Sequence, residues 1–117
     1  MFTMEIVRGL RPWQAFVKDG IQIEFLPDGV RLIEPLGIDV VRPTTKDLAL
    51  GLLAHHGTPI ELERWAAVLL AMNHVDLGAL EDEPDGEWVL ETLWDAANGQ
   101  VPSVGSYGRL SRLVYRP

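Results

Sequence analysis

The sequence predicts an α+β fold in which a small antiparallel sheet from the N-terminal half packs against about three helices. Residues 1–43 carry alternating apolar and polar runs separated by turn residues, which is typical of half-buried strands. Residues 44–99 carry three segments in which helix-start residues precede apolar positions at helical spacing. Because 117 residues accommodate one hydrophobic core but not two, we expect a single domain over 1–117.

A hairpin is the clearest feature of the N-terminal half. Residues 21–25 alternate apolar and polar side chains, and residues 30–34 return after the turn Pro27-Asp28-Gly29. Proline presets φ and glycine accepts positive φ, so this three-residue loop predicts antiparallel pairing of the flanking runs. Across such a hairpin, the polar positions Glu24 and Glu34 could face each other.

Further strands are predicted on both sides of the hairpin. Residues 38–41 follow a second turn and predict a third strand that Pro43 ends. Weaker strand patterns lie at residues 3–7 and 13–17.

The first helix is predicted near residues 45–56. Thr44 or Thr45 provides its N-cap, and the negative charge of Asp47 suits the first turn. Gly51 lowers the helix propensity by about 1 kcal/mol relative to alanine, which indicates close packing against a neighbour.

The second helix is predicted near residues 59–73. Thr58 is positioned to cap it, Pro59 occupies its first turn, and Glu61 can complete a capping box. Residues 65–72 are apolar on every side, so we expect this helix to be the centre of the core.

The third helix is predicted near residues 86–98, with Asp85 as its cap and Gly99 at its end. A buried stripe is predicted at Leu90, Leu93, Trp94 and Ala97. The side chains that we expect to be nearly inaccessible in the whole core are Trp65, Leu69, Leu90, Leu93 and Trp94.

Residues 100–117 form a connector followed by an amphipathic tail, Arg109 to Tyr115. We predict that the tail is ordered and docks by burying Leu110, Leu113 and Val114. Two docked forms are open: an edge strand added to the hairpin sheet, which we favour, and a short helix beside the acidic stripe of the third helix. The helical form would place at least one of three arginines (Arg109, Arg112 and Arg116) near Glu87, Glu91 or Asp95.

Charge is distributed unevenly along the chain, whose formal net charge is −7. No lysine or arginine lies between Trp65 and Gly108, whereas eight acids lie there. This surface would repel phosphate backbones, so we expect no nucleic-acid binding, and it would attract a basic protein. The candidate partner-binding residues are Glu83, Asp85, Glu87, Trp88, Glu91 and Asp95.

The residues that commonly perform catalysis or bind metals do not form a recognisable pattern. Cysteine is absent, which excludes thiol catalysis and cysteine-ligated metals. His55 and His56 are adjacent, so on a helix they diverge by about 100°, and His74 is remote in sequence. The segment around Ser106 resembles a nucleophile elbow only loosely. We therefore predict no catalytic residue, metal site or cofactor.

These observations favour a non-enzymatic protein–protein interaction module, with a role like that of an immunity or adaptor protein or of a subunit in an oligomer. Its partner would be a basic protein or a second copy of the chain. The longest apolar run, residues 65–72, is far too short to span a membrane, and residues 1–10 lack the apolar run of a signal peptide. We therefore expect a cytoplasmic protein without membrane contact. The alternative is a small enzyme that uses carboxylates and histidine in a cleft between sheet and helices.

Overall fold

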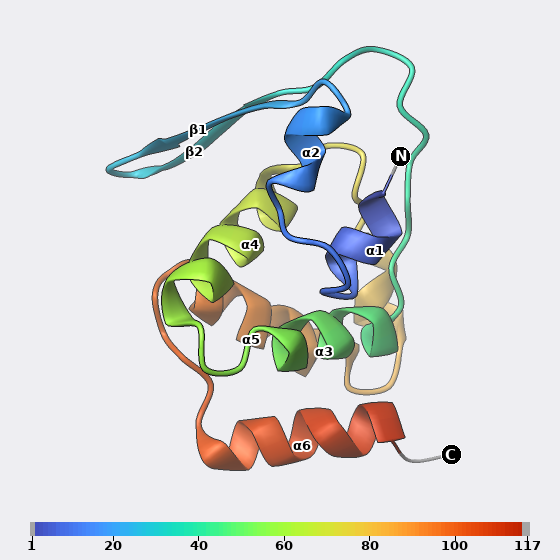
Figure 1. Cartoon of the computed structure of the whole chain (residues 1–117). Coiled ribbons are helices and arrows are strands. Elements are labelled where there is room, and N and C mark those ends of the chain that lie inside the picture. The colour runs from blue at the N-terminus through green and yellow to red at the C-terminus, as the bar shows by residue number, and fades with distance from the viewer. Residues whose placement is uncertain (1, 116–117) are drawn as a thin grey trace.

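The computed structural model describes residues 2–115, and it confirms the α+β class (Figure 1). A two-stranded antiparallel hairpin extends from one end of a helical body, and the last helix lies across the opposite end. The elements are α1 (Thr3–Val7), α2 (Ala15–Lys18), β1 (Gln22–Leu26), β2 (Gly29–Ile33), α3 (Thr45–Ala54), α4 (Pro59–Ala71), the 3₁₀ helix η1 (Gly78–Asp82), α5 (Gly86–Ala97) and α6 (Val104–Tyr115). Within residues 2–115, no helix combines the length and apolar content needed to cross a membrane.

The predicted hairpin is present, and its two faces differ. Ile23 pairs with Leu32 on the face turned to the helices, whereas Glu24 pairs with Arg31 on the opposite face and forms an ion pair with it. Leu26 pairs with Gly29, so the loop is one residue shorter than predicted.

The other predicted strands are wrong. Residues 3–7 form α1 and residues 15–18 form α2, while residue Val41 makes only an isolated parallel bridge with Val75. In α1 the buried side chains Thr3, Ile6 and Val7 follow helical spacing. Segments of four or five residues are too short for sequence alone to separate a period of 2 from one of 3.6.

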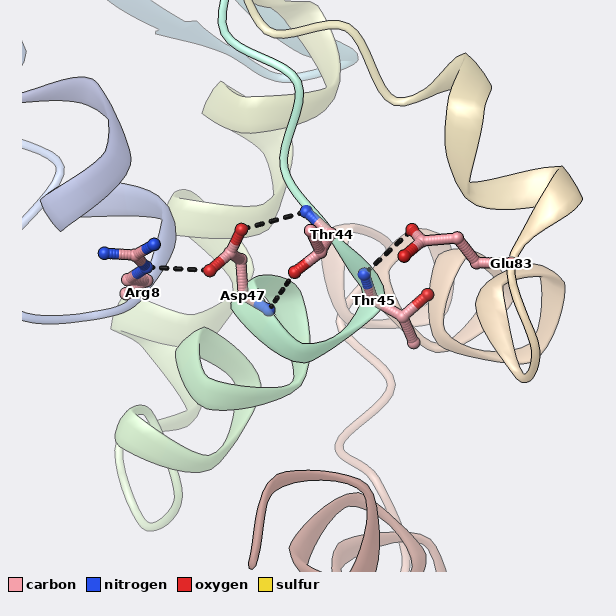
Figure 2. Close-up of polar contacts among 5 residues, drawn as sticks. All are labelled: Arg8, Thr44, Thr45, Asp47 and Glu83. Carbon is pink, nitrogen blue, oxygen red and sulfur yellow. Dashed lines mark hydrogen bonds and ion pairs between the residues drawn. The ribbon is translucent and has the colours of Figure 1, made fainter. Parts of the chain in front are cut away.

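Helix α3 begins as predicted, with Thr44 as its N-cap and Asp47 in its first turn (Figure 2). The Thr44 hydroxyl accepts from the amide of Asp47 at 3.2 Å, and the Asp47 carboxylate accepts from the amide of Thr44 at 2.9 Å. Arg8 of the α1 end donates to the same carboxylate at 2.7 Å, which ties α1 to α3. Burial alone would raise the pKa of Asp47, but these hydrogen bonds and the Arg8 charge hold it below its usual value.

The packing of α4 against α3 confirms the expectation for Gly51. Trp65 is fully buried, and its indole N–H donates to the Ile6 carbonyl at 2.8 Å. A side chain at Gly51 would overlap the Val7 carbonyl and the Trp65 ring, so glycine permits this close approach.

The predicted capping box of α4 does not form. Thr58 donates from its hydroxyl to the His55 carbonyl at 2.9 Å instead of capping α4. Glu61 accepts from the Trp13 indole at 3.1 Å, which attaches the segment before α2 to α4.

The buried face of α5 is rotated from the predicted stripe. Trp65, Leu69 and Leu93 are inaccessible as predicted, but Trp94 is 54% exposed and Leu90 is only half-buried. The buried face contains Gly86, Val89, Leu93 and Ala96. A side chain at Gly86 would overlap the Leu80 backbone, so close contact with η1 turns the face that starts at Gly86 inward.

The tail is a helix rather than the favoured edge strand. Helix α6 packs on α3 and buries Tyr107, Leu110 and Val114, while Leu113 is half-buried. The spacing of the three buried residues, i, i+3 and i+7, puts them on one helical face. Of the tail's three arginines, Arg116 lies outside the described residues.

Candidate functional site

Two of the five acids in the predicted partner-binding set are engaged within the fold. The Glu83 carboxylate accepts from the amide of Thr45 at 3.1 Å, so it supports the first turn of α3 (Figure 2). Asp85 precedes α5 with a positive φ of 62°, makes no side-chain cap, and forms an ion pair with Arg109 at 2.7 Å. Glu83 is thus a structural acceptor. Asp85 occupies the predicted N-cap position of α5, but its side chain does not form the capping hydrogen bond.

Arg109 joins α6 to the start of α5 through two contacts. Its guanidinium donates to Asp85, and its carbon Cζ lies 4.0 Å from the centre of the Trp88 ring. An arginine of the tail therefore pairs with an acid beside α5, but that acid is Asp85. The predicted acids were Glu87, Glu91 and Asp95. The half-buried Trp88 is an aromatic platform for a cation, an arrangement that stabilises by about 0.5–1 kcal/mol at exposed sites.

The remaining acids of the predicted set lie exposed along α5. Within the described residues, no basic side chain comes within ion-pair distance of Glu87, Glu91 or Asp95. Their i, i+4 spacing makes neighbours repel by a few tenths of a kcal/mol, and Asp95 lies near the negative C-terminal end of the helix dipole. The described contacts therefore reveal no stabilising role for Glu91 and Asp95.

Three of the predicted residues line a shared groove, which we call the acidic groove. Trp88, Glu91 and Asp95 line it together with Thr92, and the start of the chain segment leading into α6 lines it as well. Its volume is about 300 Å³. The linker residues that line it are Gln100, Val101, Pro102 and Ser103, and Ser106 of α6 lines it as well. The groove thus combines an aromatic wall with two carboxylates, and none of its described lining residues is basic.

An apolar pocket adjoins the acidic groove, because both are lined by Val101 and Pro102. This second hollow, which we call the histidine pocket, has a volume of about 240 Å³. The His55 ring stacks on Trp65 and its Nδ1 donates to the Gly51 carbonyl at 2.7 Å. The pocket is lined by His55, His56, Gly57, Pro59, Leu62, Val101, Pro102, Val104 and Tyr107.

Tyr107 connects this pocket to the core. Its ring centre lies 4.2 Å from that of His56, and burial raises the pKa of its hydroxyl. Within the described residues the hydroxyl has no hydrogen-bond partner. The aromatic contact and the burial of Leu110 one turn later hold the α6 start against α3.

A buried polar chain lies on the other side of the molecule and was not predicted from the sequence. The Glu34 carboxylate accepts from His74 Nδ1 at 2.7 Å, and His74 Nε2 lies 2.9 Å from the Thr3 hydroxyl. Because an ionised carboxylate only accepts, Nδ1 carries the hydrogen, and in the neutral ring Nε2 accepts from Thr3. Glu34 also accepts from the amides of Asn73 and His74.

This polar chain joins three segments that lie far apart in the sequence. Burial alone would raise the pKa of Glu34, but the hydrogen bonds from His74 and from the two amides lower it below its usual value. Glu34 therefore does not face Glu24 across the hairpin. No local signal relates residue 34 to residue 74, so sequence reasoning missed their contact.

The residues weighed for metal binding and nucleophilic catalysis are dispersed. His55 and His56 point to different neighbours, and His74 is bound to Glu34. Within residues 2–115, no group of three histidine, aspartate or glutamate side chains is arranged so that it could hold a metal ion. Ser103 accepts from the amide of Ser106 at 3.1 Å and so belongs to the start of α6.

Another hollow lies at the hairpin tip and has a volume of about 490 Å³. It is lined by the turn residues 25–29, by one face of α4 that includes Ile60 and Arg64, and by the end of α5. Its charges are mixed, because Asp28, Glu63 and Arg64 all contribute.

Comparison with models of known protein families, with curated proteins and with solved structures found no match. The geometry of the groove and pockets is therefore the guide to function.

Proposed function

We propose that this protein is a non-enzymatic interaction module that binds a basic protein partner through the acidic groove. The observation that carries the proposal is the convergence of Trp88, Glu91 and Asp95 on one hollow whose lining, among residues 2–115, includes no basic side chain. A guanidinium or ammonium group placed there would contact an aromatic wall and two carboxylates.

The contact made by Arg109 supports this proposal. On the neighbouring surface, the chain's own guanidinium lies over Trp88 and bonds a carboxylate. A partner cation between Trp88 and Glu91 would use the same two interactions. It would also relieve the repulsion along α5 that no described residue relieves.

The net charge of −7 would accelerate the approach of a basic partner and oppose that of a nucleic acid. An immunity-like or adaptor-like role fits such a surface. Self-association through α5 alone would bring like charges together, so a second copy is the less favoured partner and is tested by the concentration dependence of sedimentation.

An enzyme that uses Glu34 and His74 is the alternative. The buried chain supplies a carboxylate, an imidazole and a hydroxyl, but Thr3 is only 3% exposed and His74 only 5%. None of the three hollows described above is lined by these three residues. A substrate would have to reach a hydroxyl enclosed by the core, so this geometry favours a structural role.

The proposal is tested by neutralising the groove and comparing it with an equal charge change elsewhere. The groove variant carries Glu91→Gln and Asp95→Asn, and the control variant carries Glu81→Gln and Asp82→Asn on exposed η1 positions. Each full-length protein is immobilised and exposed to native lysate at low salt. Retained proteins are eluted with salt and identified by mass spectrometry.

We expect wild type and the control variant to retain a shared set of basic proteins that the groove variant loses. Salt elution is expected because exposed charge pairs are screened beyond about 10 Å at 0.1 M ionic strength. Equal retention by all three proteins, or a retained set that is not basic, would contradict the proposal.

A further inference from the structure

We infer that the partner segment is bipartite, with a basic side chain in the acidic groove and a nearby branched aliphatic side chain in the histidine pocket. This inference rests on the proposed function and adds a second requirement to it. It follows from the common wall of the two hollows, Val101 and Pro102, which puts an apolar site directly beside a charged one.

The chemistry of the histidine pocket selects an apolar side chain. Its lining includes Leu62, Pro59 and Tyr107, together with Val101 of the linker and Val104 at the start of α6. At its rim, Val104 is 91% exposed and Val101 is 54% exposed. Apolar side chains around a hollow are the part of a surface that gains most when a partner excludes water.

Both hollows are held in place by the fold. Ser103 caps the start of α6, Tyr107 packs on His56, and Leu110 is fully buried against α3. Arg109 holds the other wall by contacting Asp85 and Trp88. A partner segment would therefore bind a preformed surface, which avoids the entropy loss of ordering the site.

Charge complementarity favours one kind of partner segment over the others. A wholly apolar segment would leave Glu91 and Asp95 without a counter-charge, and an acidic segment would be repelled by them. A purely basic segment would leave the histidine pocket unfilled. A short segment with neighbouring basic and aliphatic residues satisfies both hollows at once.

The test uses three blocked tetrapeptides and the isotope-labelled full chain, with backbone amide chemical shifts as the readout. The first peptide alternates arginine and leucine. The second replaces leucine by glycine, and the third replaces arginine by glutamate. We expect the first peptide to shift amides around both hollows and the second to shift only those around the acidic groove.

The affinity of the glycine peptide should be about tenfold lower, because burying a leucine side chain contributes at least that factor. A variant with Val101→Ser and Val104→Ser should reduce the preference for leucine. The matched control places the same two changes at exposed sites away from both hollows, Val17→Ser and Val40→Ser, and should bind as wild type does.

The two proposals fail in different ways. Equal binding of the leucine and glycine peptides, or unchanged leucine preference in the Val101 and Val104 variant, would overturn the bipartite inference alone. If the glutamate peptide binds as well as the arginine peptide, or if Glu91→Gln with Asp95→Asn changes nothing, the proposed function is wrong as well. Absence of binding by all three peptides would also overturn the inference.

Discussion

Two parts of this protein are attached to opposite ends of the helical body by different forces (Figure 1). At one end, α6 buries Tyr107, Leu110 and Val114. At the other end, the hairpin and the strap that follows it, residues 34–41, contain no fully buried residue from 22 to 41. Their connections include half-buried apolar side chains, the Val41 bridge and the partly buried hydrogen bond between Glu34 and His74.

This difference predicts the solution conditions under which each attachment should persist. Apolar burial scales with the area removed from water and depends little on pH. A carboxylate anchor works only while it is ionised, so its contribution disappears in acid. We therefore expect α6 to stay docked under acidic conditions that loosen the strap.

The largest expected effect comes from removing the apolar anchor of α6. Leu110→Ala should lower the free energy of unfolding by about 2–5 kcal/mol, because it leaves a cavity beside α3. Denaturant unfolding measures this change. Val104→Ala is the matched control on the same helix and should have little effect, since Val104 is almost fully exposed. Equal stability of the two variants would mean that α6 does not belong to the cooperative fold.

An intermediate effect is expected from the anchor of the strap. Glu34→Gln should lower the free energy of unfolding at pH 7 by about 1–3 kcal/mol, because it weakens the bonds to His74 and two amides at a partly buried site. The folded pKa of Glu34 lies below its ordinary value of 4.5. Its stabilisation is therefore complete above pH 4.5 and is lost as the pH falls through the lowered folded pKa.

The pH dependence distinguishes this anchor from a purely steric effect. The stability difference between wild type and Glu34→Gln should be largest near neutral pH and should shrink below pH 4.5. The control is Glu24→Gln, which alters an exposed hairpin carboxylate whose partner is Arg31. A difference that stays constant down to low pH would show that ionisation of Glu34 does not hold the strap.

The smallest expected effect tests whether charge contributes to the docking of α6. Arg109→Gln should lower the free energy of unfolding by at most about 1 kcal/mol, since its pairing with Asp85 and Trp88 is partly exposed. Added salt should reduce the difference. A loss as large as that of Leu110→Ala would mean that α6 is held by charge, and the contrast with the strap would disappear.

Local signals were sufficient for several elements. The alternation around residues 27–29 predicted the hairpin, and Thr44 with Asp47 predicted the start of α3. The apolar run from residue 65 predicted the buried α4. In each case the controlling interactions lie within a few residues of one another, so the sequence pattern contains them.

The candidate site was predicted only in part. Trp88, Glu91 and Asp95 do line one groove, but Glu83 supports α3 and Asp85 holds Arg109. The histidine pocket went unrecognised, although His55, Leu62 and Val104 are visible in the sequence, because three separate elements form it. Composition identified the acidic segment but could not tell which acids were already engaged.

The sequence by itself determined the fold class, the hairpin, the three main helices and the concentration of negative charge between residues 65 and 108. Tertiary structure decided the rest. The contact of Gly86 with Leu80 set the rotation of α5, and burial of Tyr107, Leu110 and Val114 made the tail a helix. The bond between Glu34 and His74 also joins distant segments. Such contacts stabilise one arrangement only after the chain has brought remote residues together, so no local pattern encodes them.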